Sequence, residues 1–135
     1  MGYNGLADRE LIEAESAWED RELHKTLYGM LSSTTSKFPN HNAISYQLLS
    51  GPTDFAETLT WQMLHDKTVQ AANLFRSLGI GPDDVVAYVL PNSNETAITL
   101  LGGAVAGIVN PINPLLDAEQ IGAILRETNA KVVVT

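Results

Sequence analysis

Asp83 and Asp84 are adjacent carboxylates, a pair that could hold a divalent cation or carry acid–base chemistry. They come directly before residues 85–90, VVAYVL, an apolar run of strand length. The two acids therefore lie at the amino end of a strand, whereas ligand sites in open α/β sheets lie beyond the carboxyl ends. The same position counts against a phospho-acceptor receiver domain, whose acids stand where strands finish. We expect Asp83 and Asp84 to be surface acids of a turn.

The three histidines, His24, His41 and His65, are 17 and 24 residues apart and show no HxxxH spacing. Each is expected to be a surface or half-buried residue rather than a metal ligand or a catalytic base. The chain has no cysteine, which excludes disulfides, thiolate zinc sites and cysteine nucleophiles and fits a reducing compartment.

The glycines at Gly79 and Gly81 have the wrong context for a dinucleotide fingerprint, which runs from strand to glycine-rich turn to helix. Here they follow a helical pattern and precede a strand, so a helix C-cap and a turn are expected. Gly103 and Gly107 lie four residues apart, which we interpret as close packing of a soluble helix against the sheet.

Only one place in the sequence has the geometry of a ligand site, the turn Pro91-Asn92-Ser93-Asn94 at the carboxyl end of the strand at 85–90. Backbone amides and short polar side chains there could face a cleft. Helix N-capping by Asn92 or Ser93 is the commoner role of such residues, and we favour it. No residue of the chain is therefore assigned as catalytic, cofactor-binding or metal-binding.

Charge and hydropathy exclude several classes of partner. The formal net charge is −8, and residues 1–22 hold seven acids and two bases. This balance disfavours nucleic acid and anionic membranes, and Trp18 and Trp61 lack the clustered bases of a nucleic-acid stacking platform. The longest nearly apolar run, residues 97–109, is shorter than the roughly 20 residues of a membrane span. With no basic, apolar leader, a cytoplasmic protein is expected.

The elements that must position these residues follow from periodicity and caps. Residues 1–21 are expected to form an acidic helical extension, and residues 22–135 the folded α/β unit. Within that unit we expect a helix over 22–36, a strand over 43–50, a turn at 51–54 and a short second strand that ends near Leu59. The clearest helix has Thr60 as its N-cap, one apolar face up to Leu78, and Gly79 at its C′ position.

From Thr60 onward, helices and strands alternate. The buried strand at 85–90 is followed by a buried helix over 94–106, an extended stretch at 108–109, and a helix that begins at the Asp117–Gln120 capping box. Asn129 is expected to stop that helix in the left-handed conformation, and a buried strand follows at 131–135. This order predicts an α/β fold with a partial, mostly parallel sheet flanked by helices. The closing core strand suggests a chain cut within a larger sheet.

An ordered series of short motifs resembles the beginning of the adenylate-forming enzymes, which include acyl-CoA synthetases, adenylation domains and luciferases. The series comprises Thr60-Trp61, a helix ending in Leu-Gly-Ile, the strand ending in Leu90-Pro91-Asn92, a glycine-containing helix, a proline-rich connection and a helix ending in Asn-Ala-Lys. It covers residues 42–135. The stretches ANLFRSLGIGPDDVVAYVLPN and GIVNPINPLL are most similar to bacterial fatty-acid ligases. Met63 departs from the pattern, because relatives often carry Glu there.

The resemblance implies a parent AMP-forming acyl-CoA synthetase that uses ATP, Mg²⁺ and coenzyme A, of which this chain is an N-terminal fragment. It also implies motifs that these 135 residues lack: a phosphate loop, a Tyr-Gly-x-Thr-Glu segment, a ribose-binding Asp and a lysine on a mobile C-terminal domain. We therefore expect no cofactor site and no activity in this chain alone. The alternative is a stand-alone, non-catalytic interaction module. Expected partners are the rest of the parent enzyme and a second copy, bound through an exposed sheet edge or apolar face.

Overall fold

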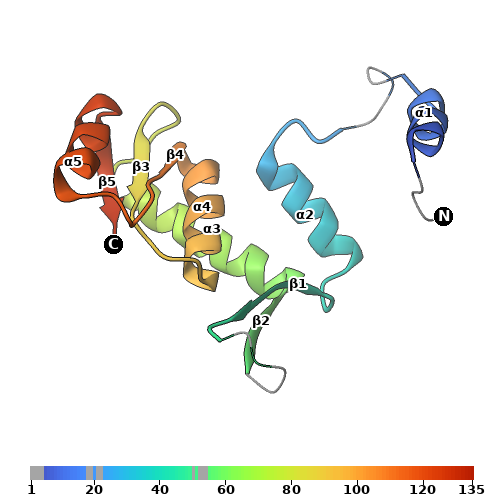
Figure 1. Ribbon diagram of the computed structural model, residues 1–135, viewed down its shortest axis with the longest axis horizontal. Helices are drawn as coiled ribbons and strands as arrows, with labels where there is room; N and C mark the ends of the chain where they lie inside the picture. Colours follow the sequence, from blue (N-terminus) through green and yellow to red (C-terminus); the bar gives the residue numbers. More distant parts are fainter. Residues whose placement is uncertain (1–4, 18–19, 21–22, 50, 52–54) are drawn as a thin grey trace.

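Helices and strands alternate along the computed structural model, which describes residues 5–17, 20, 23–49, 51 and 55–135 (Figure 1). The elements in chain order are α1 (Leu6–Ala14), α2 (Leu27–Lys37), β1 (Asn42–Gln47), β2 (Ala56–Thr60), α3 (Trp61–Ser77), β3 (Val85–Tyr88), α4 (Asn94–Ala106), β4 (Ile108–Pro111), α5 (Ala118–Glu127) and β5 (Ala130–Val134). None of the helices in the described ranges is long and apolar enough to cross a bilayer.

Three parallel strands in the order β4-β3-β5 form the sheet that the alternating pattern predicted. Val86 of β3 pairs with Val109 of β4 and with Val132 of β5. Figure 1 places α5 on one side of these strands and α3 and α4 on the other. The predicted α/β class, with a parallel sheet flanked by helices, is confirmed.

Strand β3 is buried on both faces, as expected from its continuous apolar run. Val86 and Ala87 point to opposite faces, and neither exposes any surface. The strand ends at Tyr88 instead of Leu90, although the Val89 N–H still donates to the Val134 carbonyl at 2.9 Å.

The expectation of a fully buried last strand is wrong. Along β5, Val132 and Val134 pack against the core, whereas Val133 stays 42% exposed and Lys131 is exposed. Strand β5 lies at the edge of the three-stranded sheet, and its burial pattern alternates between half-buried and exposed residues.

The principal core lies between the sheet and the helix pair α3–α4. Its buried members, from both helices, β3 and the turn before it, are Ala72, Phe75, Ile80, Val86 and Ala106. Helix α4 is the buried helix that residues 94–106 predicted.

Three glycines of α4 and its C-cap let the backbone approach its neighbours. A Cβ on Gly103 would lie 3.0 Å from Val109 Cγ2, and a Cβ on Gly107 would lie 2.5 Å from the Gly81 carbonyl oxygen. The interpretation of this pair as close packing is confirmed. Gly102, which the sequence analysis did not single out, faces α3, where its Cβ would lie 2.6 Å from Ala71 Cβ.

A second layer consists of the antiparallel hairpin β1–β2 and helix α2, joined to α3 and α4 by a smaller core of Leu31, Leu59 and Leu64. Helix α2 begins at Leu27, not at residue 22, because the Thr26 hydroxyl accepts the Gly29 N–H at 3.0 Å and caps the helix there. The strand expected over 43–50 runs from Asn42 to Gln47.

The predicted helix ends are confirmed where caps defined them. Thr60 accepts the Met63 N–H at 3.2 Å at the start of α3, and Gly79 ends that helix with φ 86°. At α5, Asp117 and Gln120 form the reciprocal capping box. Asn129 has φ 50°, the left-handed stop expected of it.

The acidic extension contains helix α1, as expected, and α1 buries none of its side chains. The expected boundary between the extension and the folded unit falls at residues 21 and 22, which lie outside the described residues.

Candidate functional site

A cleft of about 330 Å³ opens at the carboxyl end of β3, where the sequence analysis placed the one turn with ligand-site geometry. Strand β1, the end of β3 and the first turns of α4 form its walls. The lining residues are Ile44, Ser45, Tyr46, Tyr88, Asn92, Ser93, Thr96, Ala97 and Leu100.

Ser93 serves as the N-cap of α4, the role that we favoured for Asn92 or Ser93. Its hydroxyl accepts the Thr96 N–H at 3.2 Å and lies 3.3 Å from the Thr96 hydroxyl. The Thr96 hydroxyl in turn donates to the Pro91 carbonyl. These bonds join the turn to the start of α4, and Asn92 remains exposed at the cleft.

Asn94 is fully buried and ties α4 to the hairpin. Its Nδ2 donates to the Glu57 carbonyl of β2 at 3.2 Å. Its Oδ1 is buried without a hydrogen-bond partner, which is costly for an amide oxygen. This residue belonged to the turn singled out from sequence, but its partner, 37 positions earlier, carried no signal.

Two ionisable groups near the cleft have shifted pKa values. Burial raises the pKa of the Tyr88 phenol, so it remains a neutral hydroxyl. The pKa of Glu95 is lowered, chiefly by a hydrogen bond from its own backbone N–H and then by the Ser93 hydroxyl. Glu95 therefore keeps its negative charge at the positive end of the α4 dipole.

The cleft presents hydroxyls, a side-chain amide and two phenols, and none of its lining residues is basic. Such groups can bind a polar, uncharged ligand. They do not fit a nucleotide phosphate with its Mg²⁺, because the neighbouring Glu95 occupies the helix N-terminus and the described residues contain no group of three metal-ligating side chains.

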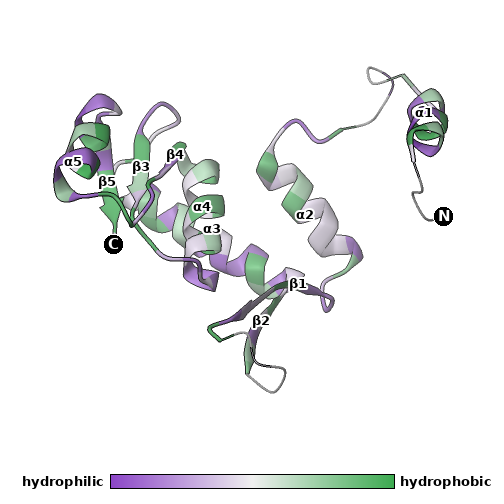
Figure 2. Ribbon diagram, viewed as in Figure 1, coloured by the Kyte–Doolittle hydropathy of each residue, from purple (hydrophilic) through white to green (hydrophobic). Residues whose placement is uncertain are grey.

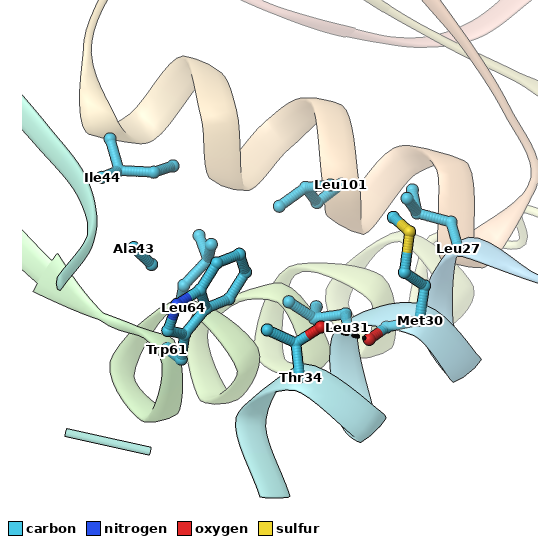
Figure 3. Close-up of a pocket in the computed structure, with 9 residues that line it drawn as sticks. All are labelled: Leu27, Met30, Leu31, Thr34, Ala43, Ile44, Trp61, Leu64 and Leu101. Atoms are coloured by element: carbon cyan, nitrogen blue, oxygen red, sulfur yellow. Dashed lines mark hydrogen bonds between the residues drawn. The ribbon is translucent and has the colours of Figure 1, made fainter. Parts of the chain in front are cut away.

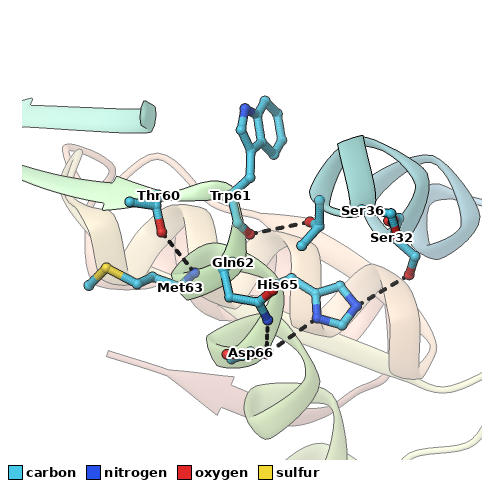
Figure 4. Close-up of polar contacts among 9 residues, drawn as sticks. Ser32, Ser36, Thr60, Trp61, Gln62, Met63, His65 and Asp66 are labelled. Carbon is cyan, nitrogen blue, oxygen red and sulfur yellow. Dashed lines mark hydrogen bonds and ion pairs between the residues drawn. The ribbon is translucent and has the colours of Figure 1, made fainter. Parts of the chain in front are cut away.

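A second polar cluster joins α2 to α3 (Figure 4). Ser32 Oγ lies 3.2 Å from His65 Nε2, and His65 Nδ1 lies 3.5 Å from Asp66 Oδ1. The order hydroxyl, imidazole, carboxylate is that of a nucleophilic triad. However, Gln62 already donates to the same Asp66 oxygen at 2.8 Å, and Ser32 lies within a helix whose amides are engaged. The cluster therefore joins α2 to α3 by a hydrogen bond, and His65 is half-buried, as expected.

The other sequence candidates do not meet at either cluster. His24 is exposed, and His41 stacks on Phe38 with ring centroids 5.3 Å apart. Asp83 is an exposed acid of the turn, as expected. Asp84 is half-buried and accepts hydrogen bonds from Gly81 and Lys131, which the sequence did not predict. Trp18 lies outside the described residues.

Trp61 lines an apolar groove of about 280 Å³, which sequence reasoning missed (Figure 3). Helix α2, strand β1 and helices α3 and α4 form the groove. Its lining residues are Leu27, Met30, Leu31, Thr34, Ala43, Ile44, Trp61, Leu64 and Leu101. The helical spacing of the apolar residues in α2 was the available signal, but it indicated only that this face would be buried.

The fold defines a parallel α/β module with a cleft at the carboxyl end of β3. The family model described as AMP-binding enzyme matches residues 31–135. The chain belongs to this AMP-binding enzyme family.

Several known proteins are similar to this chain. The marinolic acid–CoA ligase of Pseudoalteromonas sp. (strain SANK 73390) is 33% identical over 111 residues, which cover 82% of this chain and 17% of that ligase. The Mycobacterium tuberculosis fatty acyl CoA synthetase superimposes with a TM-score of 0.68 at 29% identity, over 81% of this chain and 21% of that one. The N-terminal subdomain of Klebsiella oxytoca NpsA shares the fold, with a TM-score of 0.70 at 18% identity, over 83% of this chain and 28% of that one. The chain thus spans about a fifth of the acyl-CoA ligases that it matches.

Proposed function

We propose that this chain is the N-terminal α/β portion of an AMP-forming acyl-CoA synthetase. The parent enzyme activates a carboxylic acid, of the fatty-acid type, with ATP and Mg²⁺ to an acyl-adenylate and then transfers the acyl group to coenzyme A. The observation that carries the proposal is the match of the AMP-binding enzyme model to residues 31–135, and the likeness to the fatty acyl CoA synthetase over 81% of this chain supports it.

We propose further that the chain alone is inactive and that its role in the parent is structural. Adenylyl transfer requires cations and hydrogen-bond donors placed around the phosphates. The residues that line the cleft have only neutral side chains, and Glu95 in the first turn of α4 has a lowered pKa and is negatively charged. ATP, Mg²⁺ and coenzyme A are therefore assigned to the parent and not to this chain.

A chimera tests the structural role. The segment of the Mycobacterium tuberculosis synthetase that aligns with residues 31–135 is replaced by those residues, and fatty-acid-dependent pyrophosphate release and acyl-CoA formation are measured. Activity within about tenfold of the unmodified synthetase is expected, which corresponds to about 1.4 kcal/mol of transition-state stabilisation. A control chimera carries an unrelated α/β segment of equal length and is expected to be inactive.

The outcomes separate the two functions considered from the sequence. A chimera that folds but does not turn over would contradict the synthetase role and favour a non-catalytic interaction module. The 135-residue chain, assayed with ATP, Mg²⁺, coenzyme A and several fatty acids, should release no pyrophosphate above a heat-killed control. Turnover by this chain would refute the proposal that it is inactive alone.

A further inference from the structure

The apolar groove between α2, β1, α3 and α4 has a volume of about 280 Å³ and is accessible from solvent. Met30 on its wall is 50% exposed, and Trp61 is half-buried. Figure 3 shows that the lining side chains converge on this space from the four elements. A cavity of about 150 Å³ lined by such side chains can hold a benzene molecule, so this groove has room for part of an alkyl chain.

The interior of the groove offers a ligand little besides apolar contact. None of its lining residues is charged. Their polar side-chain groups are the indole N–H of Trp61 and the hydroxyl of Thr34, and this hydroxyl already donates to the Met30 carbonyl at 2.9 Å. A polar group placed there would lose its hydration without compensation. The groove therefore fits a hydrocarbon chain.

Helix α2 gives the groove one polar end. Figure 2 shows that α2 is hydrophobic in its first turns and hydrophilic at its C-terminal end. Lys37 follows Met30 by seven positions and Thr34 by three, so the helical repeat places it on the same side of α2 as these two lining residues. It is exposed, and it takes part in none of the ion pairs among the described residues. Because residues 23–51 contain no acid, its ammonium group can pair with an anionic ligand.

We propose that the groove binds a carboxylic acid with a single unbranched alkyl chain, whose chain lies along the apolar side of α2 and whose carboxylate lies at Lys37. The two ends of such a ligand match the two ends of the groove in polarity and charge. An extended peptide fits less well, because the lining side chains cannot satisfy its backbone N–H and C=O groups. This proposal concerns binding by the chain itself and does not depend on the proposed synthetase function.

Trp61 reports binding directly, because the chain has two tryptophans and the Trp18→Phe variant leaves only Trp61. Bromine quenches indole fluorescence on contact, so this variant is titrated with dodecanoate brominated at mid-chain, below the concentration at which micelles form. Saturable quenching is expected. Octanoate, decanoate and dodecanoate should displace the probe with affinities that rise by up to about fourfold per methylene, which corresponds to about 0.8 kcal/mol for each buried CH₂.

A carboxylate in the wall of the groove should block the alkyl chain. Met30→Glu, in the Trp18→Phe background, should weaken dodecanoate binding by at least about tenfold, because the new charge must stay hydrated where the chain would lie. The matched control is Met63→Glu. Met63 is 44% exposed, does not line the groove and, two positions after Trp61, points to another side of α3. This control should bind dodecanoate as tightly as the Trp18→Phe chain.

A second pair of variants tests the place of the carboxylate. Lys37→Gln should weaken dodecanoate binding about two- to fivefold, the range of an exposed ion pair, and should leave the binding of 1-dodecanol unchanged. Lys25→Gln changes an exposed lysine beyond the opposite end of α2 and should affect neither ligand.

Three results would overturn the proposal. One is quenching of Trp61 that is absent or does not saturate. Another is an equal loss of binding in Met30→Glu and Met63→Glu, with both variants folded by circular dichroism. The third is a Lys37→Gln effect that is absent, is equal for dodecanoate and dodecanol, or is matched by Lys25→Gln, because Lys37 would then not hold the carboxylate.

Discussion

The ammonium group of Lys131 donates a hydrogen bond to Oδ2 of Asp84 at 2.7 Å, across 47 positions of sequence. The same carboxylate oxygen accepts the Gly81 N–H at 2.8 Å, and the Asp84 carbonyl accepts the Ile108 N–H at 2.9 Å. Asp84 thereby joins the turn before β3 to the beginnings of both neighbouring strands. One residue of this turn organises the amino end of the whole described sheet.

Acid should weaken this junction. Hydrogen bonds from Lys131 and then Gly81 lower the pKa of Asp84 in the folded chain, against a smaller opposing effect of burial. Because the folded pKa lies below the unfolded value of about 3.9, the stabilisation is complete above that pH and is lost as pH falls through the folded pKa. Urea unfolding should show Asp84→Asn less stable than wild type at neutral pH, with the difference shrinking below about pH 4. A difference that does not vary with pH would contradict this assignment.

The contact between α3 and α4 should not tolerate a methyl group at Gly102. The added Cβ would lie 2.6 Å from Ala71 Cβ, so Gly102→Ala is expected to lower the free energy of unfolding by about 1–3 kcal/mol. Gly122→Ala is the control, because its Cβ would meet only the flexible end of Arg126, and the better helix propensity should stabilise by up to about 1 kcal/mol. Ala71→Gly should partly rescue Gly102→Ala. Denaturant titration measures all three, and equal effects at positions 102 and 122 would exclude the close contact.

Removing the buried amide of Asn94 should lower the stability of the fold more than removing the exposed amide of Asn92. Asn94→Ala removes the donor to the Glu57 carbonyl and should cost about 1–3 kcal/mol. Asn94→Asp should cost more, because it places a carboxylate in a fully buried position. Asn92→Ala, at an exposed position, should change stability by less than about 0.5 kcal/mol. Thermal unfolding of the three variants checks this ranking, and a similar loss at both positions would be evidence against it.

A carboxylate at position 63 should strengthen the start of α3. Met63 is the third residue of that helix, it is 44% exposed, and the first turn contains no acid. Met63→Glu places a negative charge at the positive end of the helix dipole and should stabilise the chain by about 0.3–1 kcal/mol at low salt. Met63→Gln is the uncharged control. A gain that is equal for both variants, or that persists at high salt, would show that the charge is not its source.

Local signals accounted for most of the secondary structure. Thr60, Gly79, Asp117 and Asn129 lie where the sequence indicated that helices begin or end, because a cap is a contact between residues three or four positions apart. Helix α2 shows how this reasoning fails. Its apolar spacing continues back to Leu23, but the hydroxyl of Thr26 determines where the helix begins.

The position of the candidate cleft was predicted from the sequence, but most of the residues that line it were not. Parallel strands place their carboxyl ends at one edge of a sheet, so the turn after β3 could be located from sequence. Tyr46 of the distant hairpin also lines this cleft, because β1 packs on α4. No local sequence pattern encodes that contact.

By itself, the sequence determined the order and type of the elements, the parallel α/β class and the resemblance to adenylate-forming enzymes. These depend on periodicity, caps and motifs that lie within a few residues of one another. Only the tertiary structure decided that Gly102 packs against Ala71 and that Asn94 donates a hydrogen bond to the Glu57 carbonyl. The exposure of Val133 in β5 and the apolar groove lined by Trp61 were likewise decided by the tertiary structure. Each of these depends on the distance between segments far apart in the chain, which is set by packing the whole molecule at once.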